Sequence, residues 1–109
     1  MQVITKDWIY IELATAAGAR MRWPILGVDG EYAWHSDHTQ PSPPPRIVVS
    51  HIATGMRVAT FGAEEAAAAA ARKLPPLGVR AFGEKPSLSD AEREQIRNVV
   101  AALGGEIAA

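Results

Sequence analysis

The chain has 109 residues and no cysteine, and its 11 lysines and arginines nearly balance 12 aspartates and glutamates, for a net charge of −1. A protein that mainly binds a phosphate backbone carries a clear basic excess, which this chain lacks. The absence of cysteine excludes disulfides, thiolate nucleophiles and cysteine-rich zinc sites. The length predicts a single domain over residues 1–109. Because alanine supplies much of the 48% hydrophobic content, we expect a thin core, which favours a homodimer or a dedicated partner.

The sequence also predicts where the protein works. The first seven residues lack the basic start and the long apolar run of a signal peptide. No stretch approaches the roughly 18 consecutive apolar residues of a membrane-spanning helix. We therefore expect a cytoplasmic protein that does not associate with a membrane.

Two alternating segments near the N-terminus predict an antiparallel hairpin. The strands cover residues 8–13 and 21–26, with a turn between them. One face would point inward and hold Ile9, Ile11, Leu13, Met21, Trp23 and Ile25. The other face would point outward and hold Trp8, Tyr10, Glu12, Arg20 and Arg22. Across the strands, Glu12 can pair with either arginine.

Residues 27–45 predict a long loop with little regular structure. Glycines stand at positions 27 and 30, and four prolines fall within residues 41–45. The proline run favours stiff polyproline II without internal hydrogen bonds. A loop of this length in a small domain is either flexible or functional.

A second hairpin is predicted to lead directly into a helix. Residues 47–52 and 56–61 are short strand-like runs, and Gly55 between them permits the positive φ of a tight turn. An alanine-rich helix follows and ends at Pro75-Pro76, because proline cannot continue it. Residues 77–82 alternate and predict a further short strand.

The C-terminal helix has the clearest sequence signals. Ser89 and Glu92 have the spacing of a capping box. Apolar residues then recur at helical spacing, at Ile96, Val99, Val100 and Leu103, before a glycine pair that favours a helix end. The sequence thus predicts an α+β fold, in which an antiparallel sheet of about four or five strands carries two helices on one face.

The densest polar cluster is a candidate metal site. His35, Asp37 and His38 lie within four residues, and His51 is a possible third imidazole. Imidazole and carboxylate ligands suit zinc or a similar ion. The alternative is a polar loop whose side chains bond turn amides. His51 shares a strand face with Ile47 and Val49. If that face points to the core, His51 is a hydrogen-bonded core histidine; otherwise it is a half-exposed strand residue.

No pattern predicts catalysis. Ser36 and Ser50 each stand next to a histidine, but neighbouring strand residues point to opposite faces. The sequence has no nucleophile elbow, no phosphate-binding glycine loop and no paired-carboxylate motif. We therefore expect a protein that is not an enzyme and that uses no cofactor.

A sheet-based nucleic-acid-binding protein is one functional alternative. Trp8 and Tyr10 could stack on bases, and Arg20 and Arg22 could contact phosphates from the same face of the first hairpin. The near-neutral charge weighs against this interpretation.

Protein binding accounts for more of the sequence. Trp, Tyr and Arg are the residue types that anchor interfaces, and the candidates are Trp8, Tyr10, Tyr32 and Trp34. The chain is therefore interpreted as a small non-catalytic module that binds a protein partner. By analogy with other small chains without motifs, it would act as an inhibitor or accessory factor of the kind encoded by phages and mobile elements, including inhibitors of host defence complexes.

Overall fold

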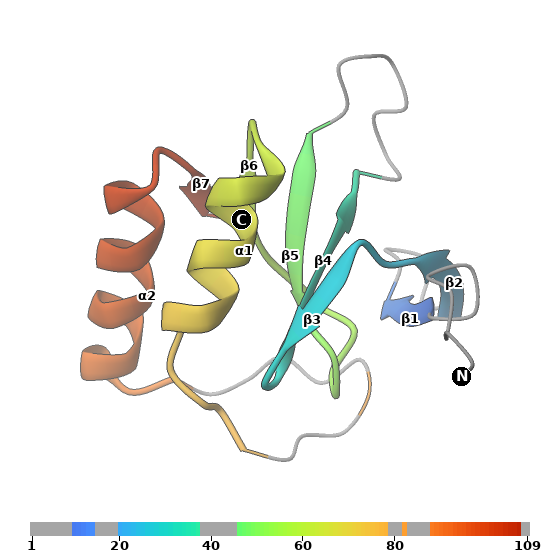
Figure 1. Cartoon of the computed structure of the whole chain (residues 1–109). Helices are drawn as coiled ribbons and strands as arrows, with labels where there is room; N and C mark the ends of the chain where they lie inside the picture. The colour runs from blue at the N-terminus through green and yellow to red at the C-terminus, as the bar shows by residue number, and fades with distance from the viewer. Residues whose placement is uncertain (1–9, 15–19, 38–45, 79–81, 83–87, 108–109) are drawn as a thin grey trace, which may run out of the picture.

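The computed structural model describes residues 10–14, 20–37, 46–78, 82 and 88–107. In chain order these residues form β1 (Tyr10–Ala14), β2 (Arg20–Pro24), β3 (Gly27–Asp29), β4 (Tyr32–Ser36), β5 (Ile47–His51), β6 (Arg57–Phe61), α1 (Glu64–Lys73), α2 (Asp90–Ala102) and β7 (Glu106–Ile107) (Figure 1). Strands β1 and β2 pair with each other and form the N-terminal hairpin. The other strands form an antiparallel central sheet in the order β3-β4-β5-β6-β7.

The protein has an α+β fold, which is the class that the sequence predicted, and its elements form three layers. Neighbouring residues of β4 point to opposite faces of the central sheet. Tyr32 packs in the main core with the buried side of α1, whereas Ala33 packs with Ile11 and Leu13 of the N-terminal hairpin. The helices therefore cover one face of the sheet and the hairpin covers the other (Figure 1).

Over its described residues, the N-terminal hairpin has the predicted inward and outward faces. Ile11 pairs with Trp23 and Leu13 pairs with Met21, and both β1 residues are buried against the sheet. The opposite side of the hairpin is exposed, and Arg20 Nη1 lies 2.6 Å from Glu12 Oε1 in the predicted cross-strand pair. The predicted start of the first strand, at residues 8 and 9, lies outside the described residues.

The predicted loop over residues 27–45 is wrong at its N-terminal end, where β3 and β4 form a hairpin. Gly30 is the first residue of the two-residue turn of this hairpin and has φ +61°, the position that favours glycine in a type II′ turn. Strand β4 is buried because the helices cover one of its faces and the N-terminal hairpin covers the other. Strand β5 pairs with it along its whole length, from Tyr32 opposite His51 to Ser36 opposite Ile47. The proline run lies outside the described residues.

The hairpin of β5 and β6 and its glycine turn are confirmed. Gly55 has φ +71°, and a Cβ there would lie 2.5 Å from Phe82 Cε1 and 2.6 Å from the Glu12 carbonyl oxygen. Glycine is thus required for both the conformation and the close approach of β1. The Gly55 carbonyl also accepts a hydrogen bond from Ala14 N at 2.9 Å. This turn therefore links the N-terminal hairpin to the central sheet.

Both predicted helices form, and small residues make the contact between α1 and the sheet. Ala67, Ala70 and Ala71 are the buried residues of α1, and alanine lets the helix backbone approach the sheet closely. Helix α2 begins with the predicted capping box of Ser89 and Glu92. Within the described residues, no helix has the length and apolar character needed to cross a membrane.

The strand predicted over residues 77–82 is not formed at Leu77 and Gly78, which have irregular backbone, and residues 79–81 lie outside the described part of the chain. Strand β7 was not predicted. It is two residues long and pairs with the edge of β6. So short a strand leaves no alternating pattern to recognise in the sequence.

Candidate functional site

The exposed side of the N-terminal hairpin, here called the hairpin face, consists of Tyr10, Glu12, Arg20 and Arg22. Tyr10 is 45% exposed, and the guanidinium carbon of Arg22 lies 4.8 Å from the centroid of its ring. Arg20 lies 4.2 Å from the ring centroid of Phe82 and also pairs with Glu12. Cation–π contacts at exposed sites contribute about 0.5–1 kcal/mol each. These contacts hold aromatic and guanidinium groups side by side on one surface.

Tyr32 is not available to a partner, contrary to the sequence prediction. Its side chain is 2% exposed, its hydroxyl donates to the Pro75 carbonyl at 2.6 Å, and its ring contacts the His51 ring edge-on. Burial, together with the charges of Glu31 and Glu92, raises the pKa of the Tyr32 phenol well above its ordinary value. The residue was misread because the loop prediction placed it outside any strand.

Trp34 does not project from a loop, because it lies in β4 and is half-buried. Its ring covers Gly27, where an added Cβ would lie 2.1 Å from Trp34 Cζ2. Its indole Nε1 donates to Glu64 Oε2 at 3.1 Å, at the first turn of α1. Trp34 therefore fills the gap between β3 and α1. The remaining predicted aromatic, Trp8, lies outside the described residues.

His35 lies in β4 and Asp37 follows the end of that strand, and both residues are buried. His35 Nδ1 lies 2.8 Å from the Ser36 carbonyl and so donates to it, which leaves Nε2 to accept from Ser50 Oγ at 2.9 Å. Asp37 Oδ1 accepts from Arg57 Nη2 at 3.0 Å. Among the described residues, no group of three metal-ligating side chains occurs. The third member of the predicted site, His38, lies outside them.

The contact between Ser50 and His35 has the chemistry of a nucleophile and its base, but not the required access. Both side chains are fully buried, so a substrate cannot reach the hydroxyl. The two residues come from paired strands β4 and β5 and point toward the N-terminal hairpin. They form a satisfied polar contact in the core.

A second buried network, which sequence reasoning missed, joins three segments at one end of the sheet. Glu31 Oε1 accepts from His51 Nε2 and from Leu77 N, both at 2.9 Å, and Oε2 accepts from Gly78 N at 3.3 Å. His51 Nδ1 then accepts from Thr54 Oγ1 at 3.1 Å. This assignment confirms His51 as a hydrogen-bonded core histidine.

The network sets the charge state of Glu31. The hydrogen bond from His51 holds the pKa of the Glu31 carboxyl below its usual range, with further help from the backbone donors at Leu77 and Gly78, although burial acts in the opposite direction. The carboxylate therefore stays ionised at neutral pH and binds the segment that follows α1. Glu31 follows Gly30 in the turn between β3 and β4. Its contacts with Leu77 and Gly78 join residues far apart in the chain, so no local sequence pattern indicates them.

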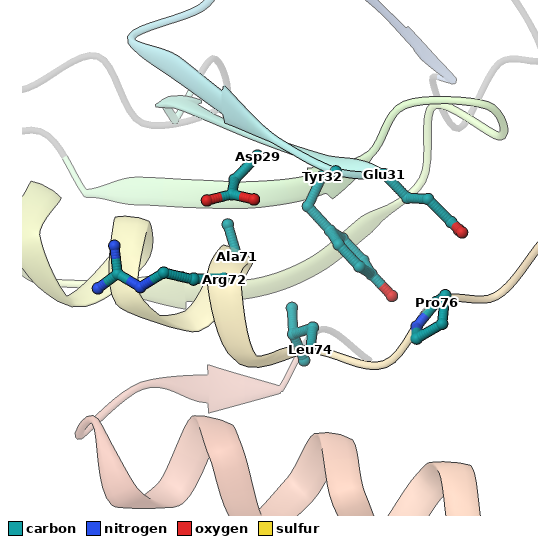
Figure 2. Close-up of a pocket in the computed structure, with 8 residues that line it drawn as sticks. Asp29, Glu31, Tyr32, Ala71, Arg72, Leu74 and Pro76 are labelled. Carbon is teal, nitrogen blue, oxygen red and sulfur yellow. The ribbon is translucent and has the colours of Figure 1, made fainter.

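Beside this network, a pocket of about 190 Å³ opens between the β3–β4 hairpin and the end of α1 (Figure 2). Its walls and floor are Asp29, Gly30, Glu31, Tyr32, Ala71, Arg72, Leu74 and Pro76. Figure 2 shows the carboxylate of Asp29 on the strand side and Arg72 on the helix side, with apolar groups between and below them. The sequence prediction included neither charged residue, because they are 43 positions apart and only the fold brings them to one pocket.

Comparison with known proteins does not assign a function. No family model, no curated protein and no solved structure matches this chain. The geometry therefore leaves two surfaces to consider. One is the hairpin face, which retains Tyr10, Arg20 and Arg22 of the predicted sites, and the other is the pocket next to Glu31.

Proposed function

We propose that this protein is a small non-catalytic module that binds another protein through the hairpin face. The observation that carries this proposal is the pairing of an exposed Tyr10 ring with the Arg22 guanidinium. Tyrosine and arginine are enriched among residues that dominate binding energy. Because the Tyr10 and Arg22 side chains already restrict each other, they lose less side-chain entropy when a partner covers them.

The charge of the hairpin face favours a protein over a nucleic acid. Glu12 neutralises Arg20 at 2.6 Å, so the face offers one net positive charge rather than a basic stripe. Nucleic-acid binding depends on several phosphate contacts. A protein surface with a carboxylate beside an apolar group fits better, since the carboxylate would meet Arg22 and the apolar group would meet Tyr10.

The biological role that we propose is that of an inhibitor or accessory factor of the kind encoded by phages and mobile elements, with a host complex as its target. Support comes from the small size of the chain and from a described surface that offers tyrosine and arginine as recognition groups. This assignment of role rests on analogy. The proposed role requires that one protein partner binds stably and that this binding depends on the hairpin face.

The test is a pull-down from host lysate with nuclease, using the wild type and a Tyr10→Ala/Arg22→Ala double variant. The matched control is Ile107→Ala/Arg97→Ala, because Ile107 is 48% exposed and Arg97 lies on the exposed side of α2. We expect one protein to be retained by the wild type and the control, and lost by the hairpin-face variant. Equal retention by both variants would contradict the proposal.

The nucleic-acid alternative makes a different prediction for the same proteins. A labelled single-stranded oligonucleotide would bind the wild type with an affinity that falls steeply as salt rises. In that case Arg20→Ala would weaken binding as much as Arg22→Ala. We expect no salt-dependent binding in this assay, and loss of all captured material on nuclease treatment would replace the protein-binding proposal with this one.

A further inference from the structure

We propose that the pocket between the β3–β4 hairpin and the end of α1 binds a free α-amino acid with an apolar side chain. Asp29 ends β3 and Arg72 lies in the last turn of α1, and both line the pocket. Figure 2 shows the Asp29 carboxylate on the strand side of the pocket and Arg72 on its helix side, with the guanidinium extended along α1. A zwitterion carries the two complementary charges on adjacent carbon atoms.

Neither charge is used within the described part of the chain. Asp29 and Arg72 take part in none of the ion pairs found there, so their charged groups are more than 4.0 Å apart. Both charged groups are therefore available to a ligand. The ammonium group of an amino acid would bind Asp29, and its carboxylate would bind the guanidinium of Arg72, which suits planar bidentate contacts.

The floor of the pocket is apolar and held in place. Ala71 and Leu74 are buried, and the Tyr32 hydroxyl is tied to the Pro75 carbonyl, so the ring cannot turn its polar end inward. Both oxygens of Glu31 are already occupied by His51 and by backbone N–H groups. An apolar side chain therefore finds an apolar surface rather than unpaired polar groups.

Size and charge together exclude other simple ligands. Pockets for drug-sized molecules have volumes of about 300–1,000 Å³, so about 190 Å³ suits a ligand the size of one residue. Arg72 would attract an inorganic anion but Asp29 would repel it. Asp29 would attract a divalent cation but Arg72 would repel it. A zwitterion satisfies both groups at once.

The test is an NMR titration of the full chain with L-leucine, N-acetyl-leucine and leucinamide. The second compound lacks the ammonium charge and the third lacks the carboxylate. We expect saturable shifts for leucine at the amides of Tyr32, Ala71 and Leu74. Each analogue should bind about tenfold more weakly, because each loses one charge-assisted contact.

Two variants assign the two ends of the ligand. Asp29→Asn should remove the preference for leucine over N-acetyl-leucine, and Arg72→Gln should remove the preference over leucinamide. Lys73→Gln is the matched control, because Lys73 is an exposed neighbour that does not line the pocket. All three positions are exposed, so the unliganded amide spectrum serves to verify that the variants fold.

Two results would overturn the inference: absence of saturable shifts with leucine, or equal binding of all three compounds. Failure here is separable from failure of the proposed protein binding. The pocket lies on the helix side of the central sheet and the hairpin face lies on the other side (Figure 1). The Tyr10→Ala/Arg22→Ala variant should therefore bind leucine like the wild type.

Discussion

Replacing Glu31 by glutamine tests whether one carboxylate fastens the segment after α1 to the sheet. Glu31 accepts hydrogen bonds from His51 Nε2, Leu77 N and Gly78 N. Glutamine has nearly the same shape and keeps one oxygen for the first two donors. It removes the negative charge, however, and presents an amide N–H group to the N–H of Gly78.

The magnitude follows from the three contacts. Hydrogen bonds to charged groups contribute about 1.5–3 kcal/mol and neutral ones about 0.5–1.5 kcal/mol, so each of two bonds weakens by about 1 kcal/mol. The third contact, to Gly78 at 3.3 Å, is long and exposed and adds little. The side chain of Glu31 is 32% exposed, so water offsets part of the loss. We expect Glu31→Gln to lower the free energy of unfolding by about 1–2 kcal/mol, or Tm by roughly 4–8 °C.

The pH dependence provides a sharper assay than the magnitude. The pKa of Glu31 is lowered in the folded protein from its ordinary value of 4.5. Its contribution to stability is therefore complete above that ordinary value and is lost as pH falls through the folded pKa. Urea denaturation from pH 7 to pH 3 should show the gap between wild type and Glu31→Gln closing at the acid end.

The control is Glu94→Gln, which removes an exposed carboxylate from a surface pair of α2. Such pairs contribute about 0–1 kcal/mol, so this variant should resemble the wild type at neutral pH. The reasoning would be refuted by equal stability of Glu31→Gln and wild type at pH 7. A gap that stays constant down to pH 3 would refute it equally.

Three further predictions concern a glycine turn, a buried hydroxyl and a helix cap. Gly55→Ala should destabilise the fold by about 2–4 kcal/mol in thermal or urea denaturation, because both its φ and its close contacts exclude a Cβ; Gly30→Ala, which has φ +61° but open space, should cost only about 1 kcal/mol. Tyr32→Phe should cost about 1–2 kcal/mol. Because the Tyr32 pKa is raised on folding, the wild type should lose this advantage as alkaline pH ionises the unfolded tyrosine, and the phenylalanine variant should not. Ser89→Ala should cost about 1 kcal/mol and lower α2 protection in hydrogen exchange.

Local patterns were sufficient wherever a segment's own residues decide its structure. Alternation gave the inward and outward sides of the N-terminal hairpin, and the positive φ of Gly55 followed from its place between two strand-like runs. The capping box of Ser89 and Glu92 was readable because its two hydrogen bonds join residues three positions apart. These features need no distant partner, so the sequence contains all the information that specifies them.

The strand at residues 32–36 could not be recognised in this way. It is buried on both faces, so hydrophobic alternation is absent and small and polar residues stand at core positions. What makes it a strand is its pairing with β5, which supplies backbone partners along its length. Tyr32 was assigned to a surface for the same reason, although α1 packs on the same side of the sheet and covers it.

By itself, the sequence determined the α+β class, the positions of both helices and the residues of the hairpin face. Only the tertiary structure decided which histidines are buried, that Glu31 fastens the linker after α1, and that Asp29 and Arg72 line one pocket. Each of these contacts joins segments that are separate in the chain. Their formation depends on how α1 packs on the sheet, because long-range geometry rather than local spacing brings those side chains together.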